Sequence, residues 1–296
     1  MWLLFALLTP LFWSLVHIAD SHCVEEIFEK PWMGVITSSL ASTVVFLVIP
    51  FAAPFIHWEL PPPYIICLGL FAGVLIQLSQ AFYFKALSYT ETGIVAAYWN
   101  MTPALIPFLS YLIFRDILGF PEYLGISLLI VASVLMCMLD TNFHARWNSF
   151  FLMFSASLFQ AFALLIEDKV FQHASYINGF LLITLGLVLA GSAPLLFKNV
   201  RKTFSRNAHL LKPAINIFIA IEVLNLFALA TSQRAIYLGN PSLVAAVETS
   251  VPAYTFLLSL ILIFFSSRFG DIETLKHLPV KFGLVGLMVL GVFLVA

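Results

Sequence analysis

VAAYWNMTPA at residues 95–104 and VAAVETSVPA at residues 244–253 share Val-Ala-Ala and Pro-Ala in the same register. Both stretches lie inside long apolar runs. Apolar helices often resemble one another through composition alone, so chance similarity is the alternative explanation. A second similarity in the same order along the chain argues against chance.

The second similarity follows each of these stretches. PEYLGISLLIVASVL begins at Pro121 and PVKFGLVGLMVLGVFL begins at Pro279, and a glycine lies at the same distance beyond both prolines. Two blocks that match in order indicate an internal repeat. The chain therefore contains two related halves, which we place at residues 1–140 and 147–296 within a single membrane domain.

The composition is that of a membrane protein. Of the 296 residues, 61% are hydrophobic and 10% are charged, and the mean hydropathy is +1.01. Soluble domains contain roughly 45–50% apolar residues. A soluble core this large would lack charged residues to cover it, whereas a bilayer solvates apolar side chains directly. We expect a multi-pass protein of the cell membrane, which in a bacterium would be the inner membrane.

The sequence also argues against several functions. The net charge is −1 and no basic run is interleaved with aromatic residues, so we expect no nucleic-acid partner. Cys23, Cys67 and Cys137 lie far apart, without the spacing of a disulfide framework or metal site. We therefore expect no metal and no cofactor. No GxxxxGK[ST] motif for ATP binding occurs in the chain.

Apolar segments of membrane-spanning length divide the chain. A transmembrane helix needs about 20 apolar residues to cross a hydrocarbon layer of ~30 Å. The first run lacks the basic region and cleavage site of a signal peptide, so we interpret it as a retained helix. The fold class is an all-α polytopic membrane protein. Its ten predicted transmembrane helices lie at residues 1–18, 32–56, 63–85, 92–114, 120–139, 147–167, 176–197, 214–236, 241–266 and 279–296.

Two related halves with ten helices contain five helices each. An odd number of helices places the second half upside down in the membrane. Inverted repeats of this kind bind substrate at their interface near the bilayer midplane and open alternately to the two sides. The two inverted five-helix repeats therefore predict alternating access.

The distribution of charge predicts the orientation. Segment 198–213, KNVRKTFSRNAHLLKP, is rich in Lys and Arg, and we interpret it as an anchor at phosphate headgroups. Of the 14 Lys and Arg residues, all but Arg115, Lys169 and Arg234 fall on the side of this segment. The positive-inside rule then places both termini outside.

Residues 82–116, FYFKALSYTETGIVAAYWNMTPALIPFLSYLIFRD, resemble the EamA-type ten-helix permeases of the drug/metabolite transporter superfamily. The resemblance covers most of the chain but is specific mainly here. It implies a permease with cytoplasmic termini, which is opposite to the orientation that the charges predict. The pattern consists of Ala-Leu-x-Tyr-Thr-x-x-Gly, an Ala-Ala pair and a helix proline, at Ala86, Leu87, Tyr89, Thr90, Gly93, Ala96, Ala97 and Pro103.

The two halves differ in how far they follow this family. Asp116 in FRD stands where the family has an acidic residue at the end of its fourth helix. In the second half, FFSSRFGD at residues 264–271 has no acid at the position that corresponds to Asp116. Equal roles for the two helix ends are therefore not expected.

Glu248 is the leading candidate for a binding residue. It lies about seven residues into the ninth predicted helix, roughly 10 Å below the surface, where a charged side chain costs about 2.5–3.5 kcal/mol. Pro252 cannot donate to the Glu248 carbonyl, so a backbone acceptor lies next to the carboxyl. This arrangement suits an amine ligand or a proton. A protonated acid that joins helices for structural reasons is the alternative.

Other polar side chains are expected to line one substrate cavity together with Glu248. Asn100 aligns with Thr249, next to Glu248 in the repeat, and Glu222 and Asn225 share one face of the eighth predicted helix. Amide and phenol groups also join membrane helices routinely, which is the structural alternative for them. The remaining candidates are Gln77, Gln80, Gln160, Tyr98, Tyr254 and His17.

Pro103 and Pro252 occupy equivalent positions in the repeat and are expected to kink their helices and to serve in gating. We expect a secondary-active transporter of a small metabolite, with an amino acid or amine as substrate and with proton coupling. It would act in the lipid bilayer as a monomer or weak homodimer. A membrane enzyme is an alternative, although the only dense acidic group in the chain, Glu167-Asp168-Lys169, lacks metal-ligand or nucleophile-base spacing. A channel or lipid-handling scaffold is a third class.

Overall fold

The computed structural model describes residues 1–26, 32–52, 60–89, 92–139, 147–211, 215–265 and 277–296. All regular secondary structure in these residues is helical, as the composition predicts. The elements are α1 (Trp2–Glu26), α2 (Trp32–Ser42), α3 (Val44–Ala52), α4 (Pro63–Leu87), α5 (Thr92–Trp99), α6 (Met101–Phe114), α7 (Phe120–Leu139), α8 (Trp147–Phe171), α9 (Tyr176–Ser192), the 3₁₀ helix η2 (Ala193–Leu196), α10 (Lys198–Leu211), α11 (Ile215–Leu238), α12 (Pro241–Glu248), α13 (Val251–Phe265) and α14 (Leu278–Val295).

Seven stretches of the described chain are long and apolar enough to cross a membrane. Two shorter apolar stretches, Trp2–Val16 and Met33–Leu47, fall within the first two predicted segments. The structure thus shows a multi-pass helical protein, with seven candidate spans where the sequence predicts ten. The seven are Pro63–Leu87, Phe120–Leu139, Trp147–Phe171, Tyr176–Leu196, Ile219–Leu238, Pro241–Ile261 and Leu278–Val295.

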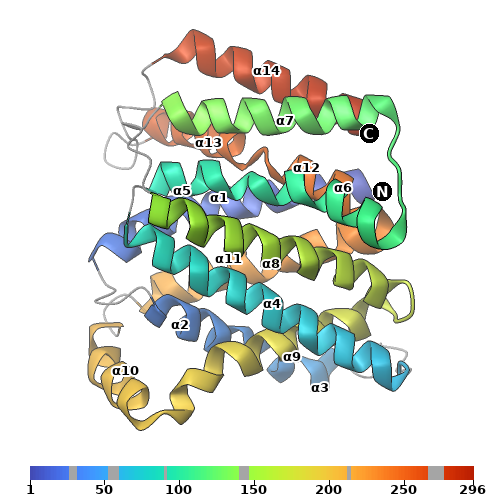
Figure 1. Ribbon diagram of the computed structural model, residues 1–296. Helices are drawn as coiled ribbons and strands as arrows, with labels where there is room; N and C mark the ends of the chain where they lie inside the picture. Colours follow the sequence, from blue (N-terminus) through green and yellow to red (C-terminus); the bar gives the residue numbers. More distant parts are fainter. Residues whose placement is uncertain (27–31, 53–59, 90–91, 140–146, 212–214, 266–276) are drawn as a thin grey trace.

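The long helices lie side by side, with their axes roughly aligned across the molecule (Figure 1). α4 packs along both α8 and α9, α1 packs along α11, and α7 pairs with α14 at one edge. Both chain termini lie at the end where α6 stops and α7 begins, which we call the termini end. α10 lies at the opposite end, which we call the α10 end. Each spanning helix therefore connects these two ends.

Two apolar helices are interrupted in the interior. α5 ends at Trp99 and α6 begins at Met101, while α12 ends at Glu248 and α13 begins at Val251. The predicted segment 92–114 is not among the seven spans, whereas Pro241–Ile261, which contains the break between α12 and α13, is one of them.

The breaks lie close to the two prolines at which the sequence predicts kinks. Pro103 and Pro252 each lie in the first turn of the helix that follows a break, where a missing N–H leaves no helical bond unmade. The break comes just before each proline. Proline cannot donate to the carbonyl four residues earlier, which belongs to Trp99 or to Glu248, so the preceding helix ends there.

Glycines bring the backbones of α4 and α9 into contact. A Cβ atom on Gly73 would strike the carbonyl oxygen of Ile183 and the amide nitrogen of Leu187. A Cβ atom on Gly186 would strike the carbonyl oxygen of Leu70. Small residues permit this close approach of membrane helices, which gives strong van der Waals packing.

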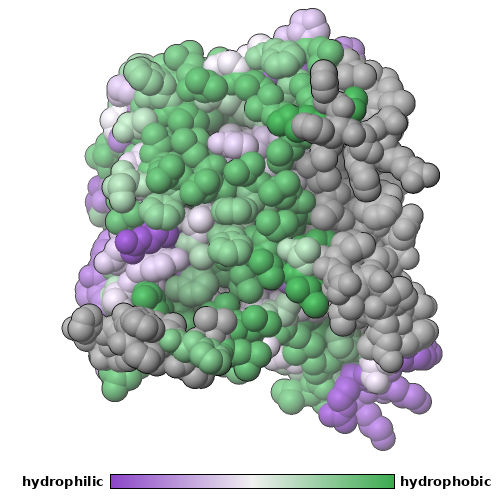
Figure 2. Space-filling view, turned by 180° about the vertical axis from the view of Figure 1, so that it is seen from behind, coloured by the Kyte–Doolittle hydropathy of each residue, from purple (hydrophilic) through white to green (hydrophobic). Residues whose placement is uncertain are grey.

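The outer surface between the two ends is apolar. Figure 2, seen from behind, shows hydrophobic residues over the middle of the described surface and hydrophilic ones along the left margin and at the lower right. The left margin in this view is the termini end, and the lower right corner is the α10 end. An apolar belt between two polar margins fits a protein embedded in a bilayer.

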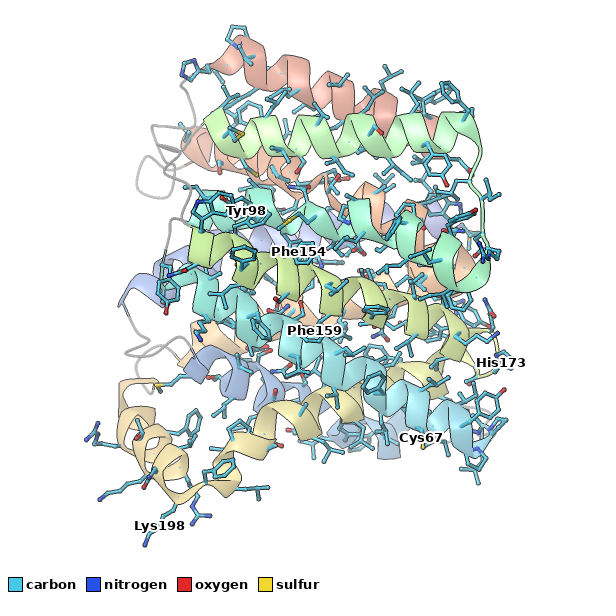
Figure 3. All side chains as sticks on the ribbon, viewed as in Figure 1. Cys67, Tyr98, Phe154, Phe159, His173 and Lys198 are labelled. Carbon is cyan, nitrogen blue, oxygen red and sulfur yellow. The ribbon has the colours of Figure 1, made fainter. Side chains whose placement is uncertain are left out.

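The segment predicted as a headgroup anchor forms the amphipathic helix α10. Its four cations at Lys198, Arg201, Lys202 and Arg206 are exposed, whereas Val200 and Phe204 are half-buried. The sequence analysis did not predict a helix here, although the apolar residues recur at helical spacing. Figure 3 shows Lys198 at the outer edge of the α10 end. An amphipathic basic helix in this position is typical of one that lies in the membrane interface.

Candidate functional site

Glu248 is the last residue of α12, directly before the break at Thr249 and Ser250. The Ser232 side chain of α11 lies near the Glu248 carboxyl. The Oε1 atom of Glu248 is buried and accepts no hydrogen bond from a described residue. Because Pro252 has no N–H, the Glu248 carbonyl also lacks its usual helical donor. The break therefore leaves two acceptors of one residue in the protein interior.

A second carboxyl, that of Glu167 in α8, lies near Glu248. The Glu167 side chain is 1% exposed, and the carboxyl of Glu248 is close enough to act on it electrostatically. Gln233 of α11 donates a hydrogen bond from Nε2 to Oε1 of Glu167 at 3.3 Å. The Oε2 atom of Glu167 is buried without a partner among the residues described. We call Glu167 and Glu248 the carboxyl pair; it lies where α8, α11 and α12 meet.

The sequence analysis missed Glu167 as a candidate site residue because it grouped Glu167 with its neighbours. In the structure, Gln172 donates to Oδ2 of Asp168 at 2.8 Å, and Lys169 donates to Oε1 of Gln172 at 3.3 Å. Successive helical residues point about 100° apart, so only Glu167 reaches the interior. The charged group considered for an enzyme is therefore not a cluster. The sequence pattern that could have indicated an inward-facing Glu167 is its position two turns after Gln160, on one face of an apolar helix.

Two side-chain amides of α8 and α11 also have oxygens that are unpartnered among the described residues. The side-chain oxygens of Gln233 and Gln160 are also buried, and neither accepts a hydrogen bond within the described part of the chain. Gln160 lies on the same face of α8 as Glu167, two turns nearer the α10 end. Buried polar atoms in native proteins are nearly always satisfied. This set of oxygens is therefore suited to a ligand that donates hydrogen bonds.

Asn100 and Thr249 stabilise the two helix breaks in the same way. The Nδ2 atom of Asn100 donates to the carbonyl oxygens of Ala96 and Ala97, both at 3.2 Å. The Oγ1 atom of Thr249 donates to the carbonyl oxygen of Ala246 at 2.7 Å. In the repeated stretches Asn100 aligns with Thr249 and Ala97 aligns with Ala246. The same side-chain position thus satisfies the same carbonyl at both breaks, and the amide donors of Asn100 are engaged within its own helix.

Helices that are broken in the interior, next to buried polar groups, are typical of membrane transporters. Residues 1–138 match the EamA-like transporter family. The resemblance predicted from the sequence is confirmed, and this part of the chain is similar to a family of transporters rather than enzymes. Comparison with curated proteins gives no match.

The likeness in three dimensions extends beyond the EamA-like residues. A solved structure described only as the crystal structure of a protein superposes with a TM-score of 0.68 and covers 99% of this chain and 97% of that chain. Its sequence is 15% identical, so the likeness shows a shared fold alone. The second half of the chain, outside the family match, therefore has the same overall architecture as a known protein.

Three of the predicted cavity residues lie apart from the carboxyl pair. Glu222 and Asn225 of α11 are neighbours, and Nδ2 of Asn225 lies 3.4 Å from Oε2 of Glu222. They precede Gln233 by about three turns, so they lie toward the α10 end. Tyr98 also lies toward that end, whereas His173 lies at the termini end (Figure 3). The structure thus brings Glu248 together with Gln233 and Glu167 but not with Glu222, Asn225 or Tyr98.

The other predicted residues have varied surroundings. Gln77 is buried, and its Nε2 atom donates to the carbonyl oxygen of Val35 at 3.0 Å, which joins α4 to α2. Gln80 and Tyr254 are half-buried in α4 and α13. His17 belongs to α1, but its side chain lies outside the described residues. Among the side chains that are described, no three His, Cys, Asp or Glu residues come together as metal ligands would.

Proposed function

We propose that the chain is a secondary transporter of a small metabolite that carries an amine, as a cation or as a zwitterion such as an amino acid. The observation that carries the proposal is the carboxyl pair with its unpartnered oxygens beside the break between α12 and α13. The EamA-like match of residues 1–138 supports transport. Conformational exchange between two inverted five-helix repeats would move the substrate across the membrane.

The chemistry of the buried atoms supports an amine. An ammonium group offers three hydrogen-bond donors and no acceptor, which complements a set of carboxyl and amide oxygens. Two carboxylates close together in the interior repel each other and lose solvation energy. A bound cation stabilises such a pair, as does a proton. Exchange of a proton for an amine at Glu167 and Glu248 would therefore couple the two.

The helix breaks support the repeat. α5 and α6 separate at Asn100, and α12 and α13 separate at Thr249 and Ser250, which align in the two halves. In the proposed repeat α1 corresponds to α8 and α4 to α11. The extensive packing of α4 on α8 and of α1 on α11 then consists of two equivalent contacts. The family match also spans nearly the whole of the proposed first repeat.

Departures from this symmetry support alternating access. α4 packs along α9 through Gly73 and Gly186, whereas the equivalent pair, α11 and α2, touches at few positions. In an inverted-repeat carrier the two conformations exchange the environments of equivalent helices. We infer that the opposite conformation packs α11 along α2 and separates α4 from α9.

The test is a ligand screen followed by a flux measurement. Purified protein in detergent is screened by thermal unfolding against amino acids, amines, nucleosides, sugars and lipophilic cations, because a ligand of the folded state raises the apparent stability. We expect a shift from an amine-bearing compound that is lost in Glu167→Gln and in Glu248→Gln. The control is Glu122→Gln, at the termini end of α7, where the carboxyl accepts the backbone N–H of Gly119.

The compound found in the screen is then measured in proteoliposomes. A carrier gives saturable uptake that is accelerated by substrate on the opposite side, whereas a channel gives neither. Shifts that persist in both carboxyl variants would place the site elsewhere. Selective shifts from sugars or nucleosides in place of amines would contradict the proposed substrate class.

A further inference from the structure

A second polar site lies on the outside of the bundle at the termini end. A pocket of about 550 Å³ opens there between α1, α9 and α11. It is distinct from the carboxyl pair, because Gln233 and Arg234 are consecutive on α11 and point about 100° apart. Gln233 reaches inward to Glu167, and Arg234 lines the pocket. The other lining residues are Phe5, Ser175, Tyr176, Ile177, Ala230, Thr231 and Tyr237.

Aromatic rings hold the guanidinium group of Arg234. Its central carbon lies 4.9 Å from the ring centres of both Tyr176 and Tyr237 and 6.0 Å from that of Phe5. The Tyr176 hydroxyl donates to the carbonyl oxygen of Ala230 at 2.7 Å, which fixes the ring in place. Stacking of this kind engages the faces of a guanidinium and leaves the N–H groups around its edge available.

In the described structure Arg234 has no ion-pair partner in contact with it; the Glu167 carboxyl, which acts electrostatically on the neighbouring Tyr176, lies on the interior side of α11. Within the described ranges, no carboxylate forms an ion pair with Arg234 and none of its N–H groups donates a hydrogen bond. Arg234 lies one turn before α11 ends at Leu238, about 6 Å along the helix. This depth is that of the aromatic belt, where lipid headgroups begin. A buried or half-buried guanidinium at this level favours an oxyanion as its partner.

The rest of the pocket suits a molecule with an apolar body. Phe5, Ile177 and Ala230 provide apolar surface, and the tyrosine rings add more. Figure 2 shows the polar margin at this end passing directly into the apolar belt. A molecule bound here could place an anionic group against Arg234 and an apolar chain along the helices.

We propose that this pocket binds the oxyanionic group, phosphate or carboxylate, of an amphiphile, with Arg234 as the anion-binding residue. Arg234 offers paired N–H donors to two oxygens of one group, as arginine does in bidentate phosphate and carboxylate recognition. The bound group supplies the contacting anion that Arg234 lacks among the described residues. The source is either an anionic lipid of the bilayer or a free amphiphilic anion.

The binding test uses dodecyl phosphate on protein purified in dodecyl maltoside. Its effect on thermal unfolding is compared with that of dodecanol, which has the same chain without the charge, and of inorganic phosphate. We expect dodecyl phosphate to raise the melting temperature and dodecanol not to. Arg234→Gln should weaken dodecyl phosphate binding about tenfold or more, because hydrogen bonds to a charged group are lost.

Two further variants separate binding from folding. Ala230→Leu fills the pocket and leaves Arg234 in place, and it should also abolish the shift. The control is Arg115→Gln at the same end, because Arg115 is exposed and its guanidinium lies 5.6 Å from the ring centre of Tyr111. Arg115→Gln should bind dodecyl phosphate as the parent protein does. Equal binding by the parent, Arg234→Gln and Ala230→Leu would overturn the proposal, as would a shift with dodecanol as large as that with dodecyl phosphate.

Native mass spectrometry distinguishes the two sources. Phosphatidylglycerol that copurifies with the parent protein but not with Arg234→Gln would identify the ligand as a bilayer lipid. Dodecyl phosphate binding without any retained phospholipid would identify it as a free amphiphile. Both results support an oxyanion site, and dodecyl phosphate binding that does not depend on Arg234 excludes it.

Discussion

The side-chain amide nitrogen of Gln233 lies 3.3 Å from Oε1 of Glu167, and this hydrogen bond joins α11 to α8 in the interior. It holds the carboxyl in place but uses only one of its two oxygens. Within the described structure, Oε2 of Glu167 and the side-chain oxygen of Gln233 remain without partners. The bond therefore positions a carboxyl group and leaves it able to accept from a ligand.

Removal of Gln233 should destabilise the protein through Glu167. Gln233→Leu leaves the buried carboxyl without its donor, which costs about 1–3 kcal/mol of unfolding free energy. Glu167→Leu combined with Gln233→Leu should cost less than the sum of the single changes, because the carboxyl and its donor are removed together. Equilibrium unfolding in mixed micelles measures both. Gln172→Leu, which removes exposed hydrogen bonds of α8, is the control and should change stability by less than about 0.5 kcal/mol.

The Glu248 carboxyl should be required for any coupling to protons. Glu248→Gln keeps the size and the hydrogen-bonding oxygen of the side chain but cannot exchange a proton. We expect transport in this variant to lose its dependence on a pH gradient while the protein still inserts and folds. Flux into proteoliposomes at several pH gradients measures this. A variant with the pH dependence of the parent protein would remove Glu248 from the coupling mechanism.

The contact between α4 and α9 should not tolerate a side chain. Gly73→Ala places a Cβ atom against the carbonyl oxygen of Ile183, and overpacking of this kind costs about 1–3 kcal/mol. Gly283 of α14 is the matched control, because nothing lies within 4 Å of the position that its Cβ would occupy. Gly283→Ala should stabilise by roughly 0.5–1 kcal/mol, since alanine loses less backbone entropy in a helix. Equal effects of the two substitutions would contradict the packing.

Composition and local sequence predicted the features that are determined within a single helix. The all-helical membrane fold follows from the apolar content, and Glu248 could be chosen because a carboxyl and a helix proline occur one turn apart. Glu167 could not be chosen in this way. Its environment depends on Gln233, which lies far away in the sequence, and nothing local separates it from Asp168, which turns away from the interior.

The helix breaks show a second limit. The sequence analysis predicted kinks at Pro103 and Pro252, and each helix is interrupted directly before the turn that contains its proline. The side chains that stabilise the breaks, Asn100 and Thr249, were recognised only as polar members of the repeat. Their capping bonds depend on which carbonyls the break leaves free, and that is a property of the folded backbone.

Replacement of the two prolines should slow the exchange between conformations. Alanine at positions 103 and 252 supplies N–H groups that can bond to the carbonyls of Trp99 and Glu248, which favours continuous helices. Each restored bond is worth about 0.5–1.5 kcal/mol, so Pro103→Ala with Pro252→Ala should slow substrate exchange about tenfold. Equilibrium substrate binding should change little. Pro107→Ala, inside α6 and away from the break, is the control, and a loss of binding without a loss of exchange rate would contradict a gating role.

The orientation in the membrane can be decided by labelling. The charge distribution predicts that the termini end faces outward and that α10 faces the cytoplasm, whereas the resemblance to EamA-type permeases implies the reverse. Gln172 and Asn199 are exposed at the two ends. In a chain without its native cysteines, Gln172→Cys should react with a membrane-impermeant maleimide on intact cells, and Asn199→Cys should react only after lysis. The opposite pattern would show that the basic helix α10 lies outside and that the positive-inside rule fails for this protein.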